Sequence, residues 1–141
     1  MPMRVVLDTS VLVAAARSQQ GASSALLKLL PCEEFSPAAS VSAFIEYRDV
    51  LLRPENLLHR TASQAEAFLN FLLSVSKLQK IHFLWRPALP DPDDDLFLEL
   101  AVAARCAYIV THNIRDFRGA EKWGVRAITP ADFLRRIKAK I

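Results

Sequence analysis

Hydrophobic and polar positions alternate along the chain in blocks that predict strands and helices in turn. Residues 4–7 are a short run that is apolar on both faces, as in a central strand of a parallel sheet, and Asp8 closes that run. The same reasoning predicts further strands at 35–37, 81–85, 108–111 and 125–128, and helices at 11–17, 24–30, 40–52, 63–75, 96–104 and 130–138. Strands that alternate with helices are typical of an α/β domain with a mainly parallel central sheet.

Turn and capping residues set several of these boundaries. Ser40 is the expected N-cap of the third helix, and Ser63 with Glu66 forms a capping-box pattern at the start of the fourth. A polar loop at residues 90–95 leads into the apolar helix at 96–104. No repeat, low-complexity tract or flexible linker interrupts the pattern, so we expect a single domain over residues 1–141.

The composition narrows the class of protein. The 141 residues are 52% hydrophobic and 23% charged, which is too apolar for a disordered chain. Lys and Arg number 18 against 15 Asp and Glu, and this mild basic excess permits a nucleic-acid partner without establishing one. The first apolar run contains Asp8, which argues against a signal peptide, and no other run could span a bilayer. We therefore expect a cytoplasmic protein without membrane association.

Three carboxylates are candidate site residues, and two of them, Asp8 and Asp95, stand at positions where an acid needs an explanation. A buried, unpaired carboxylate is strongly unfavourable, yet Asp8 sits inside an apolar run at a strand end, where parallel sheets bind ligands. Glu46 lies at the margin of the apolar face of its predicted helix, and taken alone it is explained as an ordinary exposed glutamate. Asp95 shares a helical stripe with apolar residues and has Glu99 as a repelling neighbour one turn on, which favours function over capping. The helix dipole explains Asp93 and Asp94 well.

A fourth group of polar side chains follows the strand predicted at 108–111. Thr111, Asn113 and Asp116 come at or just after its end, together with His112, which is equally well explained as a substrate contact or a bystander. Carboxylates that are packed together repel one another unless a cation lies among them. An all-oxygen ligand set suits Mg²⁺ or Mn²⁺ better than zinc.

The ordered set of motifs resembles the PIN-domain ribonuclease family, and within it the toxin-like branch of toxin–antitoxin systems. The motifs that carry the resemblance are "VVLDTSVLVAA", the glutamate of "SVSAFIEYRDVLLRP", "DPDDDLFLELAVAARCAYIVT" and "THNIRDF". They extend over nearly the whole chain. The resemblance implies a three-layer α/β/α fold, Mg²⁺- or Mn²⁺-dependent endoribonuclease activity, an antitoxin protein as partner, and a homodimer.

The resemblance also assigns roles to individual residues. The family's first three acids fall on Asp8, Glu46 and Asp95, with Asp93 and Asp94 as alternatives for the third. The fourth acid falls on Asn113, and Asp116 is expected to take its place. The hydroxyl residues Thr9, Ser10 and Thr111 are expected to support these ligands.

Two further expectations concern the substrate. A phosphate strand needs cations around an acidic site, and the candidates here are the five basic residues Arg48, Arg53, Arg115, Arg118 and Lys122. The amide at Asn113 also leaves a second interpretation open, in which a domain of the same fold binds RNA or a protein partner without cleaving anything.

Overall fold

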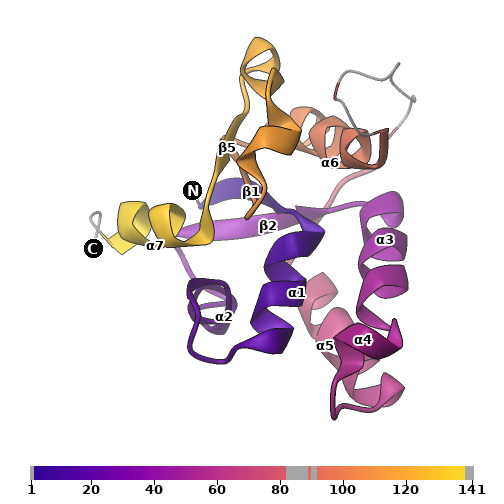
Figure 1. Cartoon of the computed structure of the whole chain (residues 1–141). Coiled ribbons are helices and arrows are strands. Elements are labelled where there is room, and N and C mark those ends of the chain that lie inside the picture. The colour runs from indigo at the N-terminus through magenta and orange to yellow at the C-terminus, as the bar shows by residue number, and fades with distance from the viewer. Residues whose placement is uncertain (1, 82–88, 90–91, 139–141) are drawn as a thin grey trace.

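The computed structural model describes residues 2–81, 89 and 92–138, and within them a five-stranded sheet forms the centre of the protein (Figure 1). The strand order is β3-β2-β1-β4-β5, and every pair of neighbours is parallel. The strands are β1 (Met3–Leu7), β2 (Phe35–Ala39), β3 (Lys77–Leu78), β4 (Tyr108–Val110) and β5 (Arg126–Ile128). The parallel sheet that the sequence predicts is therefore confirmed.

The central strand β1 fixes the register of the sheet. Leu7 pairs with Val110 of β4, and the Asp8 amide donates a 2.9 Å hydrogen bond to the Val110 carbonyl. Val5 and Val6 are fully buried, because helices cover both faces of this strand. As a result β1 and β4 end at the same edge of the sheet, and the polar residues that follow each strand meet there.

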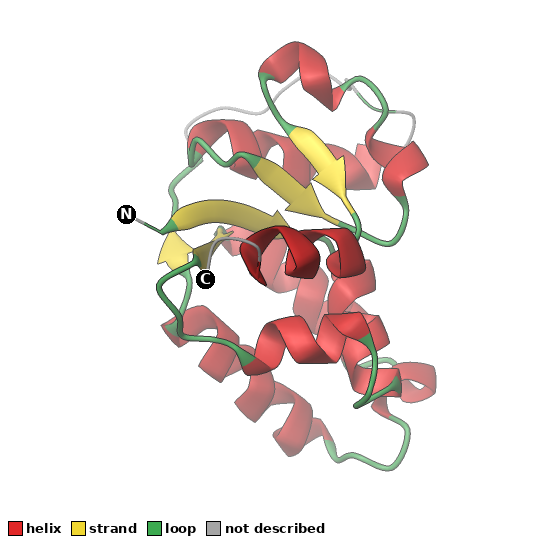
Figure 2. Ribbon diagram, turned by 90° about the vertical axis from the view of Figure 1, so that its left-hand side faces the viewer, coloured by secondary structure: helices red, strands yellow, loops and turns green. Residues whose placement is uncertain are grey.

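Helices lie on both sides of the sheet, so the three-layer α/β/α arrangement is also confirmed (Figure 2). They are α1 (Thr9–Arg17), α2 (Ala22–Lys28), α3 (Val41–Leu51), α4 (Pro54–Leu57), α5 (Ala62–Ser74), α6 (Pro92–Ala103) and α7 (Pro130–Lys138). Two 3-10 helices, η1 (Ile114–Phe117) and η2 (Ala120–Trp123), lie between β4 and β5. Helix α6 packs on β1, β2 and β4, whereas α1 packs on α2 and α3. Among the described residues, no helix is both long and apolar enough to cross a membrane.

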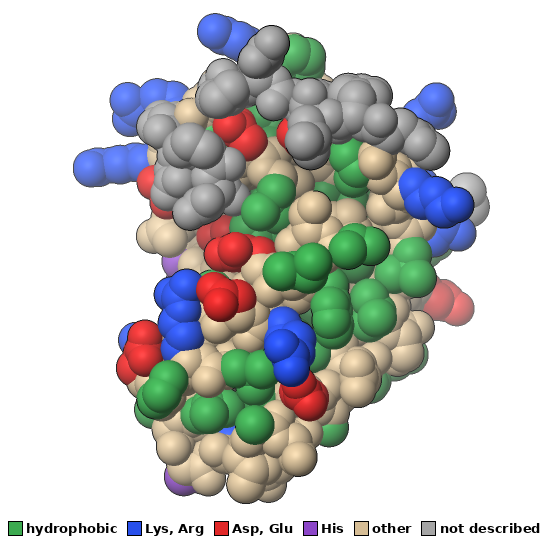
Figure 3. Space-filling model, turned by 90° about the vertical axis from the view of Figure 1, so that its right-hand side faces the viewer, with side chains coloured by type: hydrophobic (Ala, Val, Ile, Leu, Met, Phe, Trp, Pro, Cys, Tyr) green, Lys and Arg blue, Asp and Glu red, His purple; other side chains and the backbone are tan. Residues whose placement is uncertain are grey.

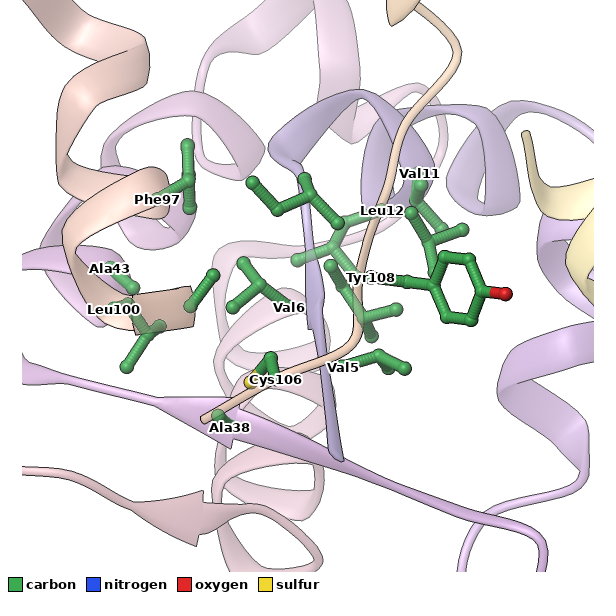
Figure 4. Close-up of a cluster of buried hydrophobic side chains, with 14 of the residues drawn as sticks. Val5, Val6, Val11, Leu12, Ala38, Ala43, Phe97, Leu100, Cys106 and Tyr108 are labelled. Atoms are coloured by element: carbon green, nitrogen blue, oxygen red, sulfur yellow. The ribbon is translucent and has the colours of Figure 1, made fainter. Parts of the chain in front are cut away.

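The core forms where these layers meet the sheet. Figure 4 shows Val5 and Val6 of β1 among side chains from α1, α3 and α6, including Phe97. On α7, the Phe133 ring packs edge-on against Phe35 of β2, with ring centroids 5.3 Å apart. The apolar face of α7 is thus buried against its own domain.

Two helix starts differ from the sequence prediction. The Ser40 N-cap is confirmed, since its hydroxyl accepts a hydrogen bond from the Ala43 amide. The capping box of α5, however, is made by Thr61 and Gln64, each side chain accepting from the other residue's amide, and not by Ser63 with Glu66. Either pair satisfies the same sequence pattern, and the N-cap lies two residues earlier than predicted.

Helix α6 begins at Pro92, so the acidic run is its first turn and not the loop that the sequence predicts. Proline at a helix start is favourable because the missing N–H has no partner there in any case. The same effect starts the short helix α4 at Pro54, which was not predicted. The strand predicted at 81–85 lies almost entirely outside the described residues; Ile81 itself is not in a strand, and the edge strand found is β3.

Candidate functional site

A cavity of about 510 Å³ opens at the edge of the sheet where β1 and β4 end. Its described lining comes from four places: the start and one stripe of α1, one stripe of α3, one stripe of α6, and the loop that enters η1. The residues are Asp8, Thr9, Ser10, Val13, Ala14, Arg17, Glu46, Val50, Asp94, Phe97, His112, Asn113 and Asp116. Acidic side chains gather on the side of the protein where α3 and α6 lie (Figure 3).

Asp8 is the most enclosed acid of the cavity, with 6% of its surface exposed. It is the N-cap residue of α1, and its backbone carbonyl accepts a hydrogen bond from the Val11 amide. Its Oδ2 accepts two further bonds, at 2.7 Å from the Ser10 hydroxyl and at 2.8 Å from the Thr111 hydroxyl. Charge-assisted bonds of this kind are among the stronger ones in proteins, so the carboxylate is held in one orientation.

Thr111 joins the two strand ends. It is fully buried, donates to Asp8 and accepts a 2.9 Å hydrogen bond from the Asn113 amide. The Ser10 hydroxyl in turn accepts from the His112 amide at 3.1 Å. The loop after β4 is therefore attached to the start of α1 through two hydroxyl groups that also hold Asp8.

Tyr47 supports the same carboxylate from behind. Its hydroxyl donates a 2.5 Å hydrogen bond to the carbonyl of Leu7, and its ring stacks on Phe97 at 5.8 Å. Burial, and secondly the nearby charge of Asp8, raise the pKa of this phenol far above its ordinary value, so it remains a neutral donor. Tyr47 is not among the residues predicted from the sequence; the available signal was a hydroxyl-bearing ring directly after Glu46 on a helix.

The structure brings Glu46 of α3 and Asp94 of α6 to the wall of the cavity, and both are partly exposed. Asp95 lies elsewhere. It is 7% exposed, its Oδ1 accepts a 3.0 Å hydrogen bond from the buried Leu89 amide, and it is not part of the cavity lining. Successive residues of an α-helix point about 100° apart, and here that rotation places Asp94 at the cavity and Asp95 away from it. The side chain of Asp93 lies outside the described part of the structure.

The two candidates for the fourth acidic position both line the cavity. Asp116 lies on η1, and its amide donates to the Asn113 carbonyl at 3.0 Å. His112 lies beside them, with its Nε2 2.7 Å from the hydroxyl of buried Ser23. That contact fixes the ring, so the loop after β4 presents an amide, an imidazole and a carboxylate to the cavity.

The oxygen atoms that line the cavity suit a hard divalent cation, although the described side chains are not grouped as a complete metal site. Among residues 2–81, 89 and 92–138, no three Asp, Glu, His or Cys side chains are grouped closely enough to hold a metal ion. Carboxylate and amide oxygens from four elements nevertheless line one cavity, and such oxygens are the ligands that Mg²⁺ and Mn²⁺ prefer. Thr9 adds a second sign of a ligand: its Oγ1 is buried in this wall and has no hydrogen-bond partner within the described residues.

The cations predicted to steer RNA lie outside this cavity. None of the five predicted basic residues is in its described lining. On the exposed surface, Arg48 pairs with Glu66 and Arg53 pairs with Asp49. Arg115 and Arg118 line a separate hollow of about 420 Å³, and Lys122 lies on η2. The Lys or Arg residue that the described lining does contain is Arg17, the last residue of α1. Arg17 is not among the residues predicted from the sequence, and the available signal was its place on the same helical stripe as Ser10.

Comparison with known protein families gives a match over most of the chain. A family model described as a PIN domain matches residues 4–115 of the chain. This segment runs from β1 into η1 and contains every residue of the cavity lining except Asp116, which is the next residue along the chain. A comparison with curated proteins found no match.

Proposed function

The chain belongs to the PIN-domain family, whose members are generally nucleases, and from this premise we propose that it cleaves RNA with the help of Mg²⁺ or Mn²⁺. One observation carries the proposal. Asp8, Glu46, Asp94 and Asp116 come from four separate elements and line a single cavity at the carboxyl edge of the sheet. Because these acids come from different elements, no single helix or strand places them together. Their mutual repulsion is relieved when they share a bound cation.

Asp8, Glu46 and Asp94 would hold the ion in this proposal, with Asn113 and Asp116 completing the set. When bound, such an ion lowers the pKa of an attacking water and stabilises charge on the phosphoryl and leaving oxygens. Asp8 is oriented by Ser10 and Thr111 before any ligand arrives.

We assign the third acidic position to Asp94 and give Asp95 a structural role. Asp94 faces the cavity, whereas Asp95 holds the Leu89 amide. At the fourth position, a neutral amide at Asn113 attracts a cation less than a carboxylate does. Asp116, one turn of η1 away, supplies the negative charge instead.

In the cell, we propose that this activity is the toxin of a toxin–antitoxin pair in the cytoplasm. The resemblance of the motifs supports that role, and so do surfaces suited to protein partners. Val41, Ile45 and Leu78 are large apolar side chains that are 78%, 61% and 65% exposed. A second hollow, of about 730 Å³ and with Phe68 and Phe71 in its wall, is also largely apolar. An antitoxin and a second copy of this chain are the proposed partners.

The direct test is incubation of the purified protein with single-stranded RNA in Mg²⁺, Mn²⁺ or EDTA. We expect fragments with either ion and none in EDTA. Cleavage that persists in EDTA would contradict metal dependence. RNA that is bound under all three conditions but never cut would favour a binding module of the same fold.

A further inference from the structure

Arg17 occupies an unusual place in the acidic cavity. Within the described lining it is the one Lys or Arg side chain, and it stands at the last residue of α1, on the stripe that starts at Ser10. An α-helix rises about 1.5 Å per residue, which places the Arg17 backbone about 13 Å from Asp8 along the helix axis. Side chains lean toward the start of their helix, and therefore here toward Asp8.

The guanidinium of Arg17 is held by a neutral partner. Its Nη2 donates a 2.9 Å hydrogen bond to Oδ1 of Asn56, on α4. Asn56 is 6% exposed and is itself fixed, since its Nδ2 donates a 2.8 Å bond to the backbone carbonyl of Val50, another residue of the cavity wall. A guanidinium has five N–H donors in a rigid plane, so four remain after this bond.

A purely structural role explains the positive charge of Arg17 but not its lack of an ion pair. A cation at the end of a helix is stabilised by the helix dipole, which is a sufficient reason for a positive charge there. However, the Ala16 carbonyl at the same helix end already accepts a 2.8 Å hydrogen bond from Arg60. Within the described residues Arg17 forms no ion pair, although acidic side chains line the same cavity. Arg17 thus lines the cavity as an exposed residue and forms no ion pair with the described acids there.

We propose that Arg17 binds a phosphate of the substrate strand that neighbours the phosphate to be cleaved, and that Asn56 fixes its direction. The inference rests on the proposed function in one respect, namely that the ligand is a nucleic-acid strand. The acids of the cavity repel such a strand, and one fixed guanidinium at the far end of the wall offsets that repulsion at a single phosphate. Arginine suits this task because its planar donors match two phosphate oxygens at once.

The test measures binding and does not need turnover. A fluorescein-labelled single-stranded RNA is titrated with the Asp8→Asn protein in Mg²⁺, with and without Arg17→Gln, at several salt concentrations. For a single strand, each phosphate contact contributes about 0.7 to the slope of log K against log salt. We expect Arg17→Gln to reduce the slope by about 0.7 and to weaken binding about tenfold at low salt.

Arg135→Gln is the matched control, because it removes the same charge from an exposed residue of α7 that pairs with Asp132. Arg17→Lys is the rescue variant; it should keep the slope while losing part of the affinity. If Arg17 only secured α4, Arg17→Gln would lower the melting temperature and leave the salt slope equal to that of Arg135→Gln. That result would overturn the inference.

The two proposals can fail separately. If wild-type protein never cuts RNA but Arg17→Gln still reduces the salt slope, the proposed catalytic function fails and the phosphate contact stands. If RNA is cut and Arg17→Gln binds like Arg135→Gln, the catalytic function stands and the role of Arg17 is wrong.

Discussion

The Tyr47 hydroxyl donates a 2.5 Å hydrogen bond to the carbonyl of Leu7, the peptide group that leads into Asp8. Tyr47 also follows Glu46 directly in α3. One buried bond therefore connects the strand that carries the first acid with the helix that carries the second. Since the ring stacks on Phe97 of α6, the helix that carries Asp94 is included in the same contact.

Tyr47→Phe should separate positioning from packing. The phenyl ring keeps its stacking, but the buried Leu7 carbonyl loses its donor, which costs about 1–3 kcal/mol of unfolding free energy. We expect the metal-dependent cleavage rate to fall about tenfold as well, since small misplacement of catalytic groups is costly. Denaturant unfolding and single-turnover cleavage measure the two effects.

Tyr108→Phe is the control for this change, because Tyr108 is a buried tyrosine that packs against Phe133 of α7 and does not line the cavity. It should leave the cleavage rate unchanged. A Tyr47→Phe protein that is destabilised but cleaves at the wild-type rate would show that the bond is structural only.

The neighbouring acids at the start of α6 should respond in opposite ways. Asp94→Ala removes a cavity carboxylate and should reduce cleavage at least about a hundredfold, with little change in melting temperature. Asp95→Ala leaves the buried Leu89 amide without its acceptor, which costs about 1–3 kcal/mol of stability, and should keep the cleavage rate. Cleavage assays and thermal melts on both proteins test this, and a reversal of the two patterns would return the third ligand position to Asp95.

Charge at the fourth acidic position should control metal affinity. Asn113→Asp adds a carboxylate to the cavity and should tighten Mn²⁺ binding, whereas Asp116→Asn should weaken it. Calorimetric titration of the two variants and the wild type measures the difference. Wild-type affinity in the Asp116→Asn protein would mean that Asp116 only forms the turn of η1.

Cys106 should make the protein sensitive to alkaline pH. Burial raises the pKa of this thiol from 9.0 to about 12, although Arg4 nearby acts in the opposite direction. Below pH 9 the thiol is neutral in both states and its contribution to stability is complete. As the pH rises from 9 toward 12, the unfolded chain ionises first, so stability falls by up to about 1.4 kcal/mol per pH unit.

Cys106→Ala should remove that part of the decline. Unfolding free energies at pH 8, 9.5 and 10.5 should fall less steeply in the variant than in the wild type. Burial is the largest cause of the raised Tyr47 pKa and is kept in the variant, so over this pH range Tyr47 stays neutral in the folded state of both proteins and the difference between the two curves reports the thiol. Parallel curves would mean that the thiol is not protected by the fold.

The sequence predicts the sheet and the first two acids because those features depend on local patterns. The apolar run before Asp8 is typical of a buried strand, and Glu46 lies on the helix that Ser40 caps, where the family resemblance identified it as the second acid. The third acid depends on where α6 begins. Pro92 starts that helix early, and a rotation of about 100° per residue then decides whether Asp94 or Asp95 faces the cavity.

Contacts between distant residues were beyond the sequence pattern. Tyr47 acts on a carbonyl 40 residues away, and Arg17 is held by an asparagine 39 residues away on a helix that was not predicted. Each of these side chains has an ordinary local explanation, as a core ring or a basic helix end. Only the packing of α3 and α4 beside α1 gives them another role.

The most direct test of the account is the initial rate of RNA cleavage as a function of Mn²⁺ concentration, for the wild type, Asp8→Asn and Asp49→Asn. Asp49 is the matched control, because it is an exposed carboxylate of α3 that pairs with Arg53 outside the cavity. The account predicts a saturating curve for the wild type and Asp49→Asn, and a rate at least about a hundredfold lower for Asp8→Asn. Equal rates for all three proteins, or cleavage that does not depend on Mn²⁺, would contradict it.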